Sequence, residues 1–194
     1  MTTQELHERL RSRFGDDVGA LGEPRVDPSC PVRRERIAEV CRFAKEEPGL
    51  ELDFLEDLTA VDWPKKNAIE LVYHLFSFRH RHGLVLKVEV DRAGPKVASV
   101  EAVWKAANWF EREVYDLFGV EFEGHPDLRR ILLPDDWIGH PLRKDYQEAG
   151  SYHGISNVRE NPLVELRRLD EKARAAAAPP PAPPAAPPSP AAKP

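Results

Sequence analysis

Residues 69–90 read IELVYHLFSFRHRHGLVLKVEV, with two alternating apolar runs on either side of a short polar turn. Apolar side chains recur at every second position of both runs, at Ile69, Leu71, Tyr73 and Leu75 and again at Leu84, Leu86, Val88 and Val90. This period of two is typical of strands with one buried face. The intervening residues 79–83 indicate a hairpin turn, so the stretch predicts an antiparallel sheet with one face covered.

Helical patterns lie on both sides of this hairpin. Residues 2–5 fit a capping box that begins a first helix. A second helix is expected to begin at Pro31, because proline suits a first helical position. Residues 54–63 fit a helix and a strand equally well, 97–100 predict a further strand, and 103–118 predict a helix that ends before a glycine. We therefore expect an α+β fold, an antiparallel sheet of about three to four strands packed with helices.

The chain of 194 residues is expected to divide into four parts. Residues 1–118 form the α+β domain, 119–160 an extended docking segment and 161–172 a short helix. Residues 173–194 contain ten alanines and nine prolines, with no large apolar side chain to offset the entropy of ordering. They therefore predict a disordered tail.

Composition and charge exclude several classes of protein. The net charge is −5 and no basic stripe dominates, which argues against nucleic-acid binding. We find no signal-peptide pattern and no apolar run that could span a bilayer. Cys30 and Cys41 form no C-x-x-C pair and are expected to be small buried residues with reduced thiols. The expected location is the cytoplasm, with a peripheral position on a membrane complex still open.

The functional signal lies in residues 108–146. The tripeptide Gly-His-Pro occurs at 124–126 and again at 139–141, each time followed by a basic pair. Residues 127–146 contain four acids and four bases. Balanced charges on a loop of fixed shape suit protein recognition, since arginine pairs with carboxylates through two parallel bonds. Prolines in such a loop lower the entropy that is lost on docking.

We expect these residues to dock a neighbouring protein. The helical wheel places Trp109, Glu113 and Asp116 outward and Glu111 near the edge of the apolar stripe, partly buried. Trp137 and Tyr146 have the character of interface anchors. The predicted docking residues come from the helix and both loops: Trp109, Glu111, Arg112, Glu113, Asp116, His125, Asp127, Arg129, Arg130, Trp137, His140, Arg143, Lys144, Asp145 and Tyr146.

A metal-dependent hydrolase is the alternative from another class. Its ligands would be carboxylates and imidazoles of the same segment: His125, Asp127, Asp135, Asp136 and His140. The residue types suit a divalent ion, but no H-x-x-x-H or H-E-x-x-H spacing occurs and a proline follows each histidine. We favour histidines that hydrogen-bond loop carbonyls, and ion pairing rather than acid–base catalysis for Glu111 and Glu113. No catalytic, cofactor-binding or metal-binding residue is assigned.

The segment resembles the C-type subunit, also known as the 30 kDa-type subunit, of respiratory complex I, the proton-pumping NADH:quinone oxidoreductase. A looser likeness reaches upstream to about residue 26 and includes 58–63. Gln147, Ile138 and the Ala/Pro tail depart from the family pattern. The motifs that carry the resemblance are Glu111-Arg112-Glu113, Asp116, Gly119, Gly124-His125-Pro126, Leu128-Arg129-Arg130-Ile131-Leu132 and Gly139-His140-Pro141-Leu142-Arg143-Lys144-Asp145-Tyr146.

The resemblance implies a cofactor-free, non-catalytic subunit of the peripheral arm, on the cytoplasmic side of the cell inner membrane. Such a subunit packs against the D-type subunit, which lines the quinone cavity, and near the B-type subunit, which holds the terminal iron–sulfur cluster. NADH, FMN, iron–sulfur clusters and quinone belong to the assembled complex, which couples electron transfer to proton translocation. Membrane association is expected through the complex only. Membrane-bound hydrogenases and formate hydrogenlyases contain an equivalent subunit, and this remains the alternative assignment.

Overall fold

The computed structural model describes residues 1–23, 28–158 and 161–177, which belong to two units, Met1–Gln147 and Glu148–Pro194. The first unit extends beyond the boundary expected at residue 118, because the segment that follows is tied back to the domain by polar contacts. Of the predicted tail, residues 178–194 lie outside the described part of the chain.

The main sheet is built from the hairpin that the alternating runs predict. Strand β3 (Ala68–Ser77) pairs antiparallel with β4 (His82–Asp91), and Tyr73 lies opposite Leu86. Strand β2 (Phe54–Trp63), whose sequence also fitted a helix, pairs antiparallel with β3 and forms one edge. The short strand β1 (Ser29–Pro31) forms the other edge, so the order is β1-β4-β3-β2.

The expectation of a purely antiparallel sheet was wrong, because β1 runs parallel to β4. Pro31 ends this strand and does not begin a helix. Proline has no backbone N–H, so it is compatible with an edge strand, whose outer side has no strand to pair with. The Pro31 carbonyl accepts a hydrogen bond from Gly19 N at 2.8 Å. A strand of three residues is too short to reveal a period of two.

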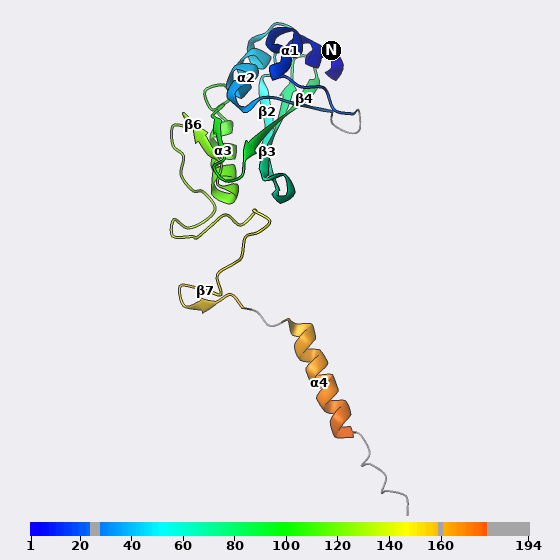
Figure 1. Ribbon diagram of the computed structural model, residues 1–194, viewed down its shortest axis with the longest axis vertical. Coiled ribbons are helices and arrows are strands. Elements are labelled where there is room, and N and C mark those ends of the chain that lie inside the picture. Colours follow the sequence, from blue (N-terminus) through cyan, green and yellow to red (C-terminus); the bar gives the residue numbers. More distant parts are fainter. Residues whose placement is uncertain (24–27, 159–160, 178–194) are drawn as a thin grey trace, which may run out of the picture. The chain divides into compact units, whose positions relative to one another are not determined.

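Three helices pack with the sheet in the first unit (Figure 1). Helix α1 (Thr3–Phe14) begins with the predicted capping box, in which Thr2 and Glu5 cap each other. Helix α2 (Ile37–Glu46) follows a 3-10 turn, η2 (Arg34–Arg36), and therefore begins later than predicted. Helix α3 (Ala107–Phe118) also begins late, since residues 101–106 form turns. Two more 3-10 turns are η1 (Gly15–Asp17) and η3 (Pro64–Lys66).

Smaller elements complete the described chain. Strand β5 (Lys96–Ala98), expected in the main sheet, pairs instead with β6 (Glu121–Glu123) in a parallel two-stranded sheet. The second unit contains the hairpin β7–β8 (Ser151–Tyr152 and Ile155–Ser156) and helix α4 (Pro162–Ala177). Helix α4 extends beyond residue 172, where the short helix was expected to end, because alanine has the highest helix propensity.

The core lies between the helices and one face of the sheet. Tyr73, Leu71 and Leu86 have no exposed surface there. Cys30 and Cys41 are free thiols in the same core, as the sequence predicts, and burial raises the pKa of the Cys30 thiol to about 12. No helix in the described ranges is both long and apolar enough to span a membrane.

One carboxylate is buried in this core with its hydrogen bonds satisfied. Glu111 of α3 has no exposed surface, and its carboxylate accepts hydrogen bonds from Ser99 Oγ at 2.6 Å and Val100 N at 2.7 Å. It therefore connects α3 to the turns that precede the helix. Burial raises the pKa of Glu111 to about 7, although both hydrogen bonds act in the opposite direction. The partial burial expected for Glu111 was an underestimate, because the turns before α3 cover that side of the helix.

We predict that Glu111 makes folding stability depend on pH. A carboxyl whose pKa is higher in the folded than in the unfolded chain binds its proton more tightly when folded. The free energy of unfolding should therefore fall as pH rises from the unfolded pKa towards about 7. The fall should be on the order of 3 kcal/mol. In Glu111→Gln this fall should disappear in urea titrations between pH 4.5 and 8, whereas Glu113→Gln, an exposed position on the same helix, should retain it. Identical pH profiles for wild type and Glu111→Gln would contradict the assignment.

Candidate functional site

The carboxylate of Asp116 holds the chain that follows α3. It is fully buried, and its Oδ2 accepts hydrogen bonds from the backbone N–H groups of Ile131, Leu132 and Leu133 at 3.1, 2.9 and 2.9 Å. Its Oδ1 accepts a hydrogen bond from Arg130 Nη1 at 3.0 Å. One side chain thus fixes four consecutive residues of the loop.

The electrostatics of Asp116 follow from these donors. Burial alone would raise the pKa of the carboxyl, but three backbone N–H groups and the Arg130 guanidinium together hold it below its ordinary value. A buried carboxylate is costly unless such donors surround it. The prediction that Asp116 faces outward was wrong, because a helical wheel describes only the helix and not a loop that returns to cover it.

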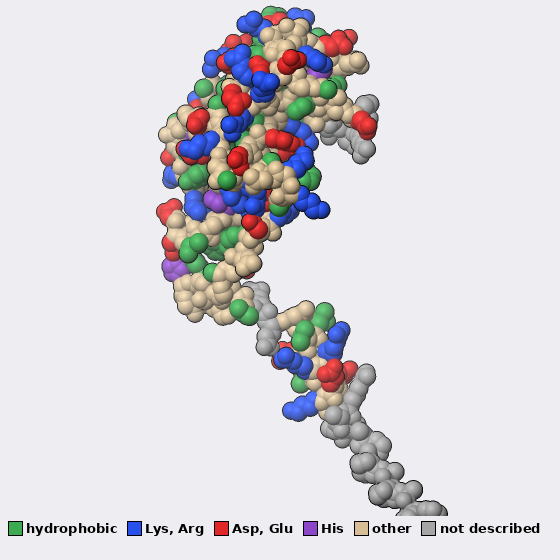
Figure 2. All heavy atoms as spheres, in the orientation of Figure 1, with side chains coloured by type: hydrophobic (Ala, Val, Ile, Leu, Met, Phe, Trp, Pro, Cys, Tyr) green, Lys and Arg blue, Asp and Glu red, His purple; other side chains and the backbone are tan. Residues whose placement is uncertain are grey.

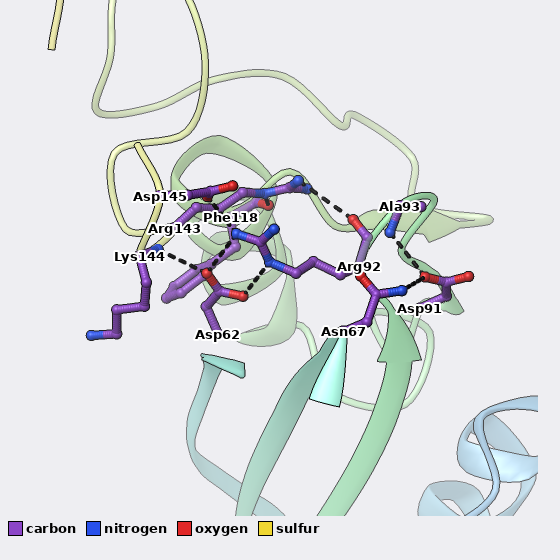
Figure 3. A network of polar contacts seen from close by, with 9 residues as sticks. All are labelled: Asp62, Asn67, Asp91, Arg92, Ala93, Phe118, Arg143, Lys144 and Asp145. Atoms are coloured by element: carbon purple, nitrogen blue, oxygen red, sulfur yellow. Dashed lines mark hydrogen bonds and ion pairs between the residues drawn. The ribbon is translucent and has the colours of Figure 1, made fainter. Parts of the chain in front are cut away.

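A second polar cluster holds the end of the first unit (Figure 3). The Asp62 side chain has no exposed surface, and Arg92 pairs with it in a fork, with Nε 2.7 Å from Oδ1 and Nη2 3.0 Å from Oδ2. Asp62 Oδ2 also accepts a hydrogen bond from Lys144 N at 2.7 Å, and Arg92 pairs with Asp145 as well. The Arg92 hydrogen bond and the Lys144 N–H lower the pKa of Asp62 against the effect of burial.

The end of α3 is capped by the segment that follows it and packs back on the domain, residues 119–147 (the returning segment). Arg143 Nε donates to the Phe118 carbonyl at 2.7 Å, and Leu142 N donates to the Leu117 carbonyl at 3.1 Å. These are carbonyls of the last helical turn, which lack partners within a helix. Arg143 therefore acts as a helix cap supplied by residues far along the chain.

Both histidines of the repeated tripeptide hydrogen-bond backbone carbonyls, as the sequence predicts. The His140 Nδ1 lies 2.9 Å from the Asp116 carbonyl, and the His125 Nε2 lies 3.2 Å from the Asn108 carbonyl. The His140 ring packs on Gly119, where a Cβ would collide with Nε2, and Gly119 has a φ of +74°. Glycine is therefore required at that position for two independent reasons. Within the described chain, no three potential metal-ligating side chains converge on one point.

The outer side of α3 presents an aromatic group. Trp109 is 63% exposed, and the Arg112 guanidinium lies 5.0 Å from the centre of its ring, a cation–π contact. Arg112 is itself buried, and its Nε donates to the Arg129 carbonyl at 3.2 Å. Glu113 is exposed, so the outward direction predicted for Trp109 and Glu113 is confirmed.

The predicted docking residues therefore divide into three sets. Those that are buried within their own domain are Glu111, Arg112 and Asp116. Those that are exposed are Trp109, Glu113, Asp127, Arg129, Lys144 and Asp145, and those that are half-buried are His125, Arg130, Trp137, His140, Arg143 and Tyr146. Asp127 and Arg129 pair with each other at 2.9 Å.

Two residues of the second cluster were not predicted as site residues. Asp62 follows Leu58 and Ala60 on the inward-facing side of β2. An acid at an inward position of an alternating strand was the available signal, because such a group requires a buried partner. Arg92 lies in a turn, and its sequence neighbourhood contains no comparable signal.

Three large apolar side chains of the returning segment face the solvent. Leu132 is 61% exposed, Ile138 85% and Leu142 47%. Ile131, Leu133 and Trp137 are half-buried, and Leu128 packs against the core. Several exposed large apolar groups close together in the sequence are typical of a surface that another protein covers.

Replacing Asp116 should release the loop. In Asp116→Asn the charge that pairs with Arg130 is lost and one acceptor oxygen becomes a donor, which should cost about 3 kcal/mol. We expect trypsin to cleave after Arg129 and Arg130 much faster than in the wild-type chain. Asp127→Asn, which removes an exposed ion pair, should cost less than about 1 kcal/mol and leave cleavage unchanged. Equal cleavage in the two variants would contradict the anchoring role of Asp116.

The sequence and fold match proteins of known family. Residues 30–152 match the family described as "Respiratory-chain NADH dehydrogenase, 30 Kd subunit". The chain is 49% identical over 139 residues to the C-type subunit of NADH-quinone oxidoreductase from Roseiflexus sp. (strain RS-1), covering 71% of this chain and 80% of that protein. It is 44% identical over 144 residues to the corresponding NADH-quinone oxidoreductase subunit of Geobacter sulfurreducens, covering 73% of this chain and 88% of that protein.

Two solved structures share the fold. The trypsin-resistant fragment (1-134) of Nqo5 aligns with a TM-score of 0.55 at 28% identity, covering 66% of this chain and all of that fragment. A chain of the membrane-bound sulfane sulfur reductase, an archaeal respiratory membrane complex, aligns with a TM-score of 0.64 at 26% identity, covering 81% and 95% of the two chains. The region of resemblance expected from the motifs is thereby confirmed, and the chain belongs to the 30 kDa subunit family of the respiratory-chain NADH dehydrogenase, the C-type subunits of NADH-quinone oxidoreductase.

Proposed function

We propose that this chain is a docking subunit of an NADH:quinone oxidoreductase, and that its own residues carry no electrons. The observation that supports this is the distribution of exposed apolar groups. Among the residues described, nine of the fourteen exposed large apolar side chains lie between Leu132 and Leu169. Exposed apolar surface concentrated in one segment is typical of a protein–protein contact.

The buried carboxylates of Asp116 and Asp62 shape the part of this segment that belongs to the first unit and carries Leu132, Ile138 and Leu142. Residues 130–133 and Lys144 are hydrogen-bonded to buried carboxylates, and Arg143 and Asp145 are held by the Phe118 carbonyl and by Arg92. Because these contacts lie within the chain itself, little entropy is lost when the surface docks. The side chains of Trp109, Ile138 and Leu142 are then presented from a fixed backbone. Aromatic and large aliphatic groups of this kind dominate the energy of protein interfaces.

Family membership supports the finer assignment of partners and location. The partners we propose are the D-type subunit of the quinone cavity and the B-type subunit with the terminal iron–sulfur cluster. In this proposal NADH, FMN, iron–sulfur clusters and quinone are bound by other subunits, and the chain keeps the quinone-reducing module in register. The complex would hold it peripherally, on the cytoplasmic side of the cell inner membrane.

A second candidate is the equivalent subunit of a related membrane-bound complex, such as a hydrogenase or formate hydrogenlyase. The similarity to a chain of the membrane-bound sulfane sulfur reductase supports this alternative, since it covers 81% of the chain described here. Identification of the proteins that co-purify with the tagged chain separates the two. A flavin-containing NADH-oxidising module among them would favour the first candidate, and its absence from an intact complex would favour the second.

The docking role predicts that Ile138→Asp impairs assembly and not folding. Ile138 is 85% exposed, so the isolated variant should unfold within about 0.5 kcal/mol of the wild-type chain. Placing a charge in an apolar contact should lower the amount of chain in the high-mass membrane fraction about tenfold, equivalent to about 1.4 kcal/mol.

Phe78→Asp provides the matched control, because Phe78 is 62% exposed but lies on the turn between β3 and β4. Native gels and quinone reductase activity should both be normal for this variant. If Ile138→Asp assembles normally and only turnover is lost, the chain takes part in the chemistry and the docking proposal is wrong.

A further inference from the structure

One arginine of α3 is buried without a carboxylate to balance its charge. Arg112 is only 5% exposed. Its Nε donates to the Arg129 carbonyl at 3.2 Å, and its guanidinium lies 5.0 Å from the centre of the Trp109 ring. In the part of the chain that the structure describes, Arg112 forms no ion pair. A buried charge that lacks an opposite charge is costly, so this arginine calls for an explanation.

The acids beside Arg112 are already engaged by other arginines. Asp116 pairs with Arg130 at 3.0 Å, and Asp127 pairs with Arg129 at 2.9 Å. The hydrogen bond from Arg129 lowers the pKa of Asp127, and the charge of Arg112 contributes in the same direction without contact. Arg112 is therefore the cation of this group that has no partner of its own.

Water solvates the outer end of Arg112 in the isolated chain. Both Nη atoms contact the solvent, because neither is among the polar atoms of the described chain that are fully buried without a partner. The ring against which the guanidinium packs is itself 63% exposed. Trp109 and Arg112 are three residues apart on α3 and therefore neighbours on the helix surface. A protein that covers Trp109 thus also removes the water from Arg112, and it must supply an acceptor in place of that water.

The donors and the surrounding charges favour a carboxylate of a protein as that acceptor. A guanidinium presents parallel N–H groups that match the two oxygens of a carboxylate. A lipid surface, in contrast, is attracted by clusters of lysine and arginine. Figure 2 shows acidic and basic side chains interspersed over the visible face of the first unit. The exposed Glu113 follows Arg112 directly and would repel an anionic membrane.

We infer that Arg112, packed against Trp109, binds the side chain of an aspartate or glutamate from another subunit of the complex. This rests on the proposed function, since it assumes that the chain docks in such a complex. It adds the chemistry of one contact to that proposal: the partner covers the indole ring and places a carboxylate at the Nη atoms beside it.

Zero-length crosslinking tests the inference in the intact complex. A water-soluble carbodiimide joins an amine to a carboxylate that contacts it, so Arg112→Lys places a reactive amine at the proposed contact while keeping the charge. We expect an amide between position 112 and an aspartate or glutamate of another subunit, identified by mass spectrometry. Arg42→Lys, at an exposed position of α2, is the matched control and should give about tenfold less product with other subunits.

Arg112→Gln separates docking from folding. Glutamine places its amide nitrogen at the position along the side chain that Nε occupies in arginine, so the donor to the Arg129 carbonyl is retained while the charge is lost. Because that charge has no partner in the isolated chain, the variant should unfold at the same urea concentration as the wild type or a higher one. The amount of chain in the high-mass membrane fraction should fall about tenfold. Arg42→Gln should change neither quantity.

Several results would overturn the inference. These are an amide from position 112 to Asp127 or another acid of the same chain, an amide to a lipid, no amide in an assembled complex, normal assembly of Arg112→Gln, or unfolding of the isolated Arg112→Gln chain at a much lower urea concentration. If Ile138→Asp still lowers assembly, the proposed function stands while the role of Arg112 falls. If the wild-type chain is absent from every high-mass complex, both fail.

Discussion

The buried Asp116 carboxylate fixes the loop that follows α3, and the proposed docking surface depends on that loop. It accepts hydrogen bonds from three successive backbone N–H groups and from Arg130, so the chain after α3 cannot leave the helix without exposing a charge and several donors. The donors in turn keep the carboxyl ionised by lowering its pKa. Such a group is expensive to bury and still more expensive to leave unpaired. The hydrogen bonds to Asp116 thus fix the conformation of the following loop and the surface that it presents.

The Asp62 cluster repeats this arrangement at the other end of the loop. Arg92 joins Asp62, in the sheet, to Asp145, at the end of the first unit (Figure 3), and the Lys144 N–H completes the pairing. Two buried carboxylates on two different elements therefore define the path of residues 128–147. Leu128 packs against the core, while the side chains of Leu132, Ile138 and Leu142 remain exposed on the outside.

Local patterns in the sequence predicted the local structure well. The hairpin of β3 and β4 and the capping box of α1 depend on neighbours in sequence, and both are confirmed. The parallel strand β1 depends on a partner more than fifty residues away, and a helix-start pattern at Pro31 was the stronger local signal. The burial of Asp116 was missed for the same reason, because the donors that satisfy it lie 14 to 17 residues further along the chain. The family motifs located the functional segment without indicating which of its residues face inward.

The central claim is that the loop is ordered by its own domain before any partner binds. Amide hydrogen exchange on the isolated, unassembled chain tests this most directly. The account predicts that the N–H groups of Leu132, Leu133 and Lys144 exchange at least a hundredfold more slowly than in an unstructured peptide, because buried carboxylates hold them. Exchange at the rate of an unstructured peptide, with protection only after assembly, would show that the partner orders the loop and would contradict the account.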